Sequence, residues 1–392
     1  MVTTSRADYG IYRPLLHAIH NDPALCLRLL VSGMHLSPEY GFTVREIEAD
    51  GYEIAERIES LLASDTPEAI GKSMGLTAIG FAQVFGRWRP DILVVSGDRF
   101  EMFAAAVAAV PFNVPLAHLG GGDVTTGAID DGLRHSLTKL SHLHFADTQE
   151  AADRIVQMGE EPWRVVVSGD PALDHLRTLK LLTREQLEAK YPFQLASPFL
   201  IVTYHPVTRQ YEQAAAQITQ LLDALREFNM PVVFTMPNAD TANRPIREQI
   251  MQFVAARPSS WLVDNLGTEP YFSLMALASA MVGNSSSGVV EAASFKLPVV
   301  NVGIRQSGRV RAKNVIDVGN ETHEIVAAIR KALDPGFAES LRDLVNPYGS
   351  GSASPVILDK LKNVQIDDAL LQKRFYDLPQ RSTSPRPTGG KP

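Results

Sequence analysis

Cysteine is nearly absent from this chain, and its scarcity excludes two kinds of cross-link. The 392 residues include a single cysteine, Cys26, which excludes an internal disulfide framework and a cysteine metal cage and is typical of a reducing cytoplasm. Long apolar runs are also missing: the longest, residues 102–110, has about half the length that spans a bilayer. The first residues show no signal-sequence pattern either. We therefore expect a cytoplasmic protein without a membrane partner.

An excess of positive charge is missing as well. The formal net charge is −7, which provides no general attraction for nucleic acid or for an anionic membrane. Any polyanionic ligand must therefore be bound by a local cluster of donors. The hydrophobic fraction of 45% is sufficient for a sizeable core, and the length suggests two or three domains.

Short apolar runs recur along the chain, and most end in Gly, Ser, Asp, Asn or His before a helical pattern. In the first part these runs predict strands at 91–96, 115–118, 142–146 and 164–168, with helices over 99–110 and about 149–158. Residues 1–4 leave little room for a full first strand. Strands alternating with helices at this spacing indicate parallel sheets with right-handed crossovers.

The pattern pauses over a charged helical segment, about 178–197, and then restarts. Further strands are predicted at 199–204, 231–236, near 280–282, 298–302 and 314–318. We expect an α/β protein with two Rossmann-like domains, residues 1–180 and 197–365, whose parallel sheets face a central cleft. The Pro-, Ser- and Gly-rich tail, residues 378–392, is predicted to be disordered.

The groups suited to chemistry lie just after the predicted strands. In an open α/β sheet such positions line one crevice, where backbone N–H groups at helix starts favour anions. The densest stretch is HLGGGDVTTGAIDDGLRH, residues 118–135, which holds three carboxylates, five glycines, two histidines and an arginine. It is either a flexible loop or the floor of an active site.

The stretch GNSSSGVVEAASF, which begins at Gly283, has two interpretations. Small residues at a strand-to-helix turn let hydroxyls and N–H groups approach a phosphate, or they form a serine-rich helix N-cap. It matches neither a Walker loop nor a G-x-G-x-x-G fingerprint, so the sequence does not support nicotinamide or ATP chemistry. Arg6 and Arg305 are candidate phosphate clamps or surface charges, and His205 is a phosphate donor or a structural residue.

No metal or cofactor is expected. His142 and His144 share one face of a predicted strand, but no third ligand follows at metal-site spacing. We therefore interpret both histidines as structural.

An ordered series of motifs resembles the UDP-N-acetylglucosamine 2-epimerase family, in particular its hydrolysing branch, which feeds sialic and legionaminic acid synthesis. The motifs are TSRADYG, SGMHLSPEYGFTVREIEADGY, SGDRFE, AIDDGLRHSLTKLSHLHF, YHPVT, PNAD and GNSSSGVVEAASFKLPVVNVGIRQSGR. The resemblance runs from Thr3 to about residue 350. It implies a fold of the glycosyltransferase-B type and a reaction in which the C2 proton is removed, UDP leaves C1 and water adds to the glycal.

The resemblance also implies roles for individual residues. The catalytic carboxylates would be Asp98 and Asp130, with Asp131 and Asp123 beside them. The residues that would bind UDP or the substrate are Arg6, Asp8, Arg99, His205, Asn238, Asp240, Ser285, Ser286, Glu291 and Arg305. Within this group Glu291 would grip the ribose and Arg6, His205, both serines and Arg305 the phosphates.

One departure from the family pattern stands in the glycine-rich stretch. Relatives commonly read H-I-E-G-G-E or H-I-H-G-G-E, whereas this chain has Gly120 at the third position and Asp123 at the last. Three explanations are open: Asp123 takes over part of the work, Gly120 makes room for another sugar substituent, or activity is impaired. We favour the second, since the 4-acetamido group of a 2,4-diacetamido-2,4,6-trideoxy sugar needs such space.

The sequence thus predicts a hydrolysing nucleotide-sugar 2-epimerase that acts on UDP-N-acetylglucosamine or on a UDP-2,4-diacetamido-2,4,6-trideoxyhexose. The alternatives are a non-hydrolysing epimerase, a glycosyltransferase of the same fold and a non-catalytic nucleotide-sugar binding protein. We expect a nucleotide-sugar ligand and a homo-oligomer, either a dimer or a tetramer.

Overall fold

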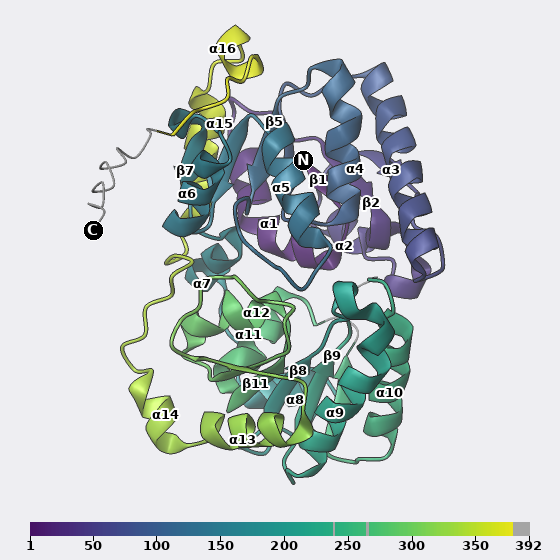
Figure 1. Cartoon of the computed structure of the whole chain (residues 1–392), viewed down its shortest axis with the longest axis vertical. Coiled ribbons are helices and arrows are strands. Elements are labelled where there is room, and N and C mark those ends of the chain that lie inside the picture. Colours follow the sequence, from purple (N-terminus) through teal and green to yellow (C-terminus); the bar gives the residue numbers. More distant parts are fainter. Residues whose placement is uncertain (238–239, 264–265, 379–392) are drawn as a thin grey trace, which may run out of the picture.

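Two sets of parallel strands form the framework of the protein. The structure is a computed structural model that describes residues 1–237, 240–263 and 266–378. Figure 1 shows the two α/β halves stacked along the longest axis of the molecule. All but the first residue of the predicted tail, and Asn238, lie outside the described residues.

The first half contains two sheets with short parallel strands. One sheet has the order β1-β2-β3 and the other β4-β5-β6-β7, and β1 lies beside β4. The strands are β1 (Val2–Thr3), β2 (Leu29–Ser32), β3 (Ile54–Ile58), β4 (Leu93–Ser96), β5 (Leu116–Leu119), β6 (Leu143–Ala146) and β7 (Val165–Val167). The first strand has only two residues, as the sequence indicated.

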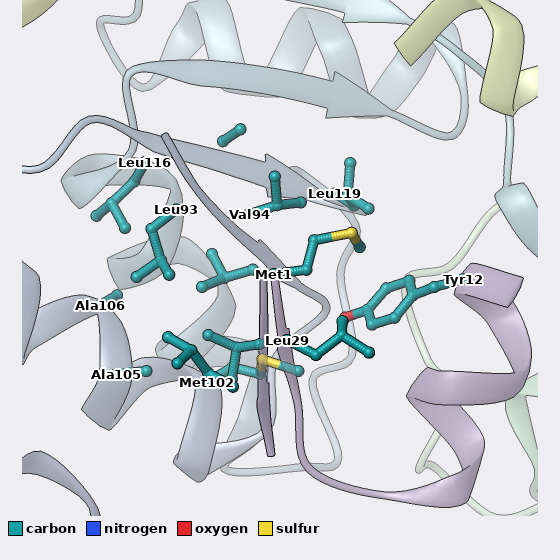
Figure 2. Close-up of a cluster of buried hydrophobic side chains, with 14 of the residues drawn as sticks. Met1, Tyr12, Leu29, Leu93, Val94, Met102, Ala105, Ala106, Leu116 and Leu119 are labelled. Atoms are coloured by element: carbon teal, nitrogen blue, oxygen red, sulfur yellow. The ribbon is translucent and has the colours of Figure 1, made fainter. Parts of the chain in front are cut away.

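Helices cover the sheets of the first half. They are α1 (Arg6–His20), α2 (Val44–Ala49), α3 (Pro67–Arg87), α4 (Phe100–Ala109), α5 (Asp130–Leu140), α6 (Gln149–Gln157) and α7 (His175–Thr178). In Figure 2, Met102, Ala105 and Ala106 of α4 lie against side chains of the sheet. The small alanines let α4 approach the sheet closely, and all three side chains are fully buried.

The second half is built on a single six-stranded parallel sheet of order β10-β9-β8-β11-β12-β13. Its strands are β8 (Leu200–Thr203), β9 (Val232–Thr235), β10 (Ser260–Val263), β11 (Ala280–Gly283), β12 (Val299–Val302) and β13 (Val315–Val318). Its helices are α8 (Arg184–Lys190), α9 (Ala214–Arg226), α10 (Asn243–Ala255), α11 (Thr268–Leu277), α12 (Ser286–Val289), α13 (Thr322–Ala332) and α14 (Pro335–Ser340).

Both faces of this sheet are covered, so its strands are continuous apolar runs. Leu200 and Val202 of β8 pack into one hydrophobic layer, whereas Ile201 packs into the layer on the opposite face. From β8 the chain adds β9 and β10 on one side of the sheet and then β11, β12 and β13 on the other side. The position between β8 and β11 is therefore a topological switch point, where an α/β sheet opens a crevice for ligands.

The end of the described chain returns to the first half. Helices α15 (Ala353–Asn363) and α16 (Asp368–Leu371) contribute buried apolar residues to the core of that half, and Figure 1 shows them beside β7 and α6. The carboxylate of Asp174 accepts from the N–H groups of Ala353 and Ser354, at 2.8 and 2.6 Å. Helix α15 lies within the bounds 197–365 predicted for the second domain, but it buries its apolar face against the first half.

Candidate active site

Several of the predicted site residues lie where the two halves meet. Arg99 of the first half forms an ion pair with Asp240 of the second, with 3.3 Å between Nη1 and Oδ1. Arg6 donates to the backbone carbonyl of Met236 at 3.4 Å. The carboxyl ends of both sheets thus face one another, as the sequence predicted.

A cavity of about 220 Å³ lies between the halves. Its walls combine α1, the ends of β8 and β9, α11 and the serine-rich loop after β11. Five predicted binding residues line it, together with residues that were not predicted: Arg6, His205, Ser285, Ser286 and Glu291, with Arg13, His175, Thr268 and Tyr271 among the others. This mixture of cationic, hydroxyl and carboxyl groups suits a ligand that carries both phosphate and sugar hydroxyls.

The serine-rich loop is held rigidly by its neighbours. Gly283 has φ +135°, and any side chain there would collide with the backbone of Thr203 on β8. Asn284 accepts from the N–H of His205 at 2.7 Å and donates to its carbonyl at 2.8 Å, which ties the two loops together. Ser285 is also the N-cap of α12, since its hydroxyl accepts from the N–H of Ser287 at 3.3 Å.

His205 is a neutral group in this setting. Burial lowers the pKa of His205 well below its usual value, and the charges of Arg305, Arg6 and Arg99 lower it further. A neutral imidazole retains one N–H that can be donated to an anion. Arg305, the other predicted clamp, donates to the carbonyl of Asn284 at 3.2 Å.

Glu291 is a buried carboxyl in the lining of the cavity. Burial raises the pKa of Glu291 to about 8, and the carboxyl of Asp170 adds to the effect. Its Oε2 has no hydrogen-bond partner among the described residues. An unpaired buried oxygen is expensive, so this atom is suited to receive a hydroxyl from a ligand.

Asp98 follows β4 and belongs to a buried charge network. Its carboxylate forms an ion pair with Arg134, whose guanidinium also donates to the carbonyl of Gly120 at 3.0 Å. Burial by itself would raise the pKa of Asp98, but the charges of Arg134, Arg309 and Arg305 outweigh it and hold the pKa below its usual value. Asp98 is therefore ionised at neutral pH and can act as a base.

Asp130 begins α5 and has the opposite character. Burial raises the pKa of Asp130 to about 7, with added repulsion from Asp98 and Asp240, while Arg305 and Arg99 oppose the shift. Two carboxyls with well-separated pKa values in one cleft form an arrangement suited to acid–base chemistry.

Known proteins resemble this chain over nearly all of its length. The sequence model of the family described as UDP-N-acetylglucosamine 2-epimerase matches residues 17–362. The chain belongs to the UDP-N-acetylglucosamine 2-epimerase family. The GDP/UDP-N,N'-diacetylbacillosamine 2-epimerase (hydrolyzing) of Campylobacter jejuni is 38% identical over 96% of this chain and 98% of its own length. The UDP-N,N'-diacetylbacillosamine 2-epimerase (hydrolyzing) of Legionella pneumophila is 36% identical over 95% and 97%.

Solved structures of the family share the fold. The UDP-GlcNAc 2-epimerase of Neisseria meningitidis, bound to UDP-GlcNAc, matches with a TM-score of 0.77 at 20% identity, over 92% of this chain and 98% of that one. The enzyme of Methanocaldococcus jannaschii, in complex with UDP-GlcNAc and UDP, matches with a TM-score of 0.78 at 17% identity, over the same 92% and 98%. The predicted glycosyltransferase-B-type arrangement of two α/β domains is confirmed.

Two of the predicted site residues, Asp8 and Asp131, hold nearby backbone N–H groups. Asp8 accepts from the backbone N–H groups of Thr4 and Ser5, at 3.1 and 2.9 Å, and closes the capping box at the start of α1. Asp131 accepts from the N–H of Thr125 at 2.6 Å and so fixes the loop before α5. The structure does not bring either carboxylate into the cavity.

Gly120 has a backbone reason to be glycine that the sequence did not reveal. Its φ is +69°, a left-handed conformation that disfavours any side chain. A Cβ atom at this position would lie 3.4 Å from Oδ2 of Asp147, which follows the neighbouring strand β6. Burial raises the pKa of Asp147 well above its usual value, with Asp170 and Asp123 adding to the shift. The space beside Gly120 is therefore bordered by a neutral carboxyl.

Sequence reasoning missed the two buried arginines that organise the carboxylates. Arg134 stands in the motif DDGLRH, four residues after Asp130, so both lie on one face of α5. Arg309 stands in the motif RQSGR and lies 3.5 Å from Asp123 across the cleft. Both motifs were visible in the sequence, but only the fold shows that these arginines are buried among carboxylates.

Within residues 1–237, 240–263 and 266–378, the structure contains no group of three or more His, Cys, Asp or Glu side chains that could hold a metal ion. In the same ranges no helix is both long and apolar enough to cross a membrane. His144 is paired with Glu160 at 3.1 Å, and His142 accepts from the N–H of Leu116 at 3.1 Å, in line with structural roles.

Proposed function

We propose that the protein is a hydrolysing nucleotide-sugar 2-epimerase whose substrate is UDP-N,N'-diacetylbacillosamine, a UDP-linked sugar with two acetamido groups. The observation that carries this proposal is the cavity between the two halves, which Arg6, His205, Ser285, Ser286 and Glu291 line, with the carboxyls of Asp98 and Asp130 close enough to the same junction to interact with Arg305 of the second half. Relatives at 36–38% identity that bear this activity in their names support the choice of substrate.

The cavity would hold the UDP part of the substrate. Arg6, the neutral ring of His205 and the hydroxyls of Ser285 and Ser286 would donate to the diphosphate. The unpaired oxygen of Glu291 would receive a ribose hydroxyl. Fixed donors of this kind bind the departing diphosphate more tightly as it gains charge.

The chemistry would follow from the two carboxyls. Asp98 takes the proton from C2 as the C1–O bond to UDP breaks, and the products of this step are UDP and a glycal. Water then gives its oxygen and one proton to C1 as hydroxyl, while a second proton reaches C2 from the opposite face. Asp130, which is protonated below about pH 7, would supply that proton and regain one from the attacking water. Asp98 releases the proton from C2 to solvent before the next turnover.

Gly120 would set the choice of sugar. Gly120 lies close to Asp98, because Arg134 contacts both the carbonyl of Gly120 and the Asp98 carboxylate. The absence of a side chain at Gly120 leaves the floor of the site open at this point. The neutral carboxyl of Asp147 at 3.4 Å from the missing Cβ gives this floor a polar edge. We expect the second acetamido group to lie over Gly120.

A panel of nucleotide sugars tests the proposal. The protein is incubated with UDP-N,N'-diacetylbacillosamine, its GDP-linked counterpart and UDP-N-acetylglucosamine, and the products are separated by anion exchange. Free 2-epimeric sugar plus UDP, released fastest from the diacetamido substrate, is the expected result. Retention of the nucleotide on an epimerised sugar would instead indicate a non-hydrolysing epimerase, and no turnover of any donor would refute the proposal.

The assembly and the cellular place of the enzyme are part of the same proposal. We infer a dimer or tetramer that works in the cytoplasm, on the path to a sialic or legionaminic acid. Light scattering of the purified protein tests the assembly, and a single species with the mass of one chain would contradict it.

A further inference from the structure

Two loops from opposite halves interlock at the edge of the site. The loop formed by residues 123–127 follows β5, and the loop formed by residues 304–309 follows β12. The N–H of Thr126 donates to the carbonyl of Ser307 at 3.1 Å. This hydrogen bond joins the halves through their backbones.

Glycines make the close approach of these loops possible. A Cβ atom at Gly127 would lie 2.5 Å from the carbonyl oxygen of Ile304, so the backbones themselves are in contact. Gly308 has φ +91°, and a side chain there would collide with Val124. Both glycines stand where a side chain would force the loops, and therefore the halves, apart.

The interlocked loops carry Arg309 into the carboxylates of the first half. Its side chain is only 10% exposed, and its Nη2 lies 3.5 Å from Oδ2 of Asp123. Asp123 lies 3.8 Å from Arg134, the ion-pair partner of Asp98. Arg309, from the second half, thus joins the ion pairs that Asp123, Arg134 and Asp98 form in the first half.

This charge acts on the group that we assign as the base. Burial by itself would raise the pKa of Asp98. Three arginines oppose this effect and hold the pKa below its usual value, and Arg309 is one of them. The charged and titratable groups that face Asp98 are Arg134 and Asp130 on α5, His118 on β5, and Arg305 and Arg309 from the second half. Of these, the arginines of the second half reach Asp98 only when the halves are together.

We propose that Arg309 is a positioning residue that couples the meeting of the two halves to the placement of the Asp98 carboxylate, through Asp123 and Arg134. When the loops interlock, its guanidinium holds Asp123 in place and stabilises the Asp98 carboxylate, so that the site becomes competent only when closed. This inference rests on the proposed function, because it deepens the account of the same acid–base pair. Arg309 does not line the nucleotide cavity, although its charge lowers the pKa of Glu291, which does.

The variant Arg309→Gln tests this role, with Arg309→Lys as the conservative change. Lys313→Gln is the matched control, because it removes the same charge from an exposed position nearby. We expect Arg309→Gln to lower kcat/KM about 10- to 100-fold at pH 7, where Asp98 stays ionised, because Asp123 and Arg134 are no longer held in place beside it. We also expect the acidic limb of its pH profile to move upward by about one pH unit or more, since a neighbouring opposite charge shifts a carboxyl pKa by this amount. Arg309→Lys should restore part of both, and UDP affinity should stay within about threefold.

Amide hydrogen exchange gives a readout that does not need turnover. Residues 123–128 should exchange faster in Arg309→Gln than in the wild-type protein, because the Thr126 N–H loses its partner when the loops separate. An unchanged pH profile together with unchanged exchange would overturn the inference, as would a loss of UDP affinity as large as the loss of kcat/KM. If the wild-type protein turned over no nucleotide sugar, the proposed function would fail, and unchanged exchange would then refute the coupling by itself.

Discussion

Replacement of Asp98 by asparagine separates the chemistry from the binding of UDP. The change preserves the size of the side chain but removes the charge that would take the C2 proton. General base catalysis typically contributes about 10²- to 10⁴-fold, so kcat/KM should fall by a factor in this range, equivalent to about 3–5 kcal/mol in the barrier. UDP affinity should change by less than about threefold, because Asp98 is not part of the cavity lining.

The same substitution has a cost in stability that the structure allows us to bound. Arg134 is 2% exposed and would lose its ionic partner, yet it would keep its hydrogen bond to the carbonyl of Gly120 and its proximity to Asp123. Breaking a fully buried pair costs about 3–5 kcal/mol. Because Asp98 is 23% exposed and water can reach the pair, we expect a smaller loss, about 1–2 kcal/mol.

Three assays measure these effects independently: UDP release for turnover, isothermal titration for UDP affinity and thermal or chemical unfolding for stability. Asp153→Asn, an exposed change on α6, serves as the control and should leave all three unaltered. If Asp98→Asn weakened UDP binding as much as turnover, Asp98 would be a binding residue. Turnover within tenfold of wild type would mean that another group is the base.

Three further predictions follow from the same contacts. Gly120→Glu should lower kcat/KM on the diacetamido substrate at least tenfold, because the left-handed backbone costs about 1–2 kcal/mol for a side chain that also meets Asp147; a gain in activity on UDP-N-acetylglucosamine would contradict this reasoning. The value of kcat/KM should fall as pH rises through about 7, since Asp130 then loses its proton. This alkaline limb of the pH profile should vanish in Asp130→Asn, and a wild-type profile that is flat from pH 6 to 9 would exclude the acid role. Asp174→Ala should lower the free energy of unfolding by about 1–2 kcal/mol in denaturant titrations, because the first N–H groups of α15 lose their cap, whereas an unchanged midpoint would show that this cap contributes nothing.

Local patterns in the sequence were sufficient for most of the fold. Buried strands such as β8 and β12 are short apolar runs followed by turn residues, and each predicted strand is present with its ends moved by only one or two residues. The strands that sequence reasoning missed were β2, β3 and β10. Of these, β3 and β10 are edge strands with half-buried residues, so their hydrophobic pattern is weak.

The site was predictable as a set of residues after strands, but not in its charge pairing. The positions of Asp98, Asp130 and His205 follow from the strand pattern, because parallel strands end at the same edge of a sheet. The burial of Arg309 depends on contacts between loops that lie about 180 residues apart in the chain, and no local pattern encodes such a contact. The roles assigned to the individual site residues stay predictions.

The fate of the C2 hydrogen tests the central claim most directly. The reaction is run in D₂O with UDP-N,N'-diacetylbacillosamine, and the products are analysed by NMR and mass spectrometry. Elimination followed by hydration predicts one deuterium at C2 of a free sugar with inverted C2 configuration, accompanied by an equal amount of UDP. A released sugar with its original hydrogen and configuration at C2, or deuterium found only in a sugar that still carries the nucleotide, would contradict the account.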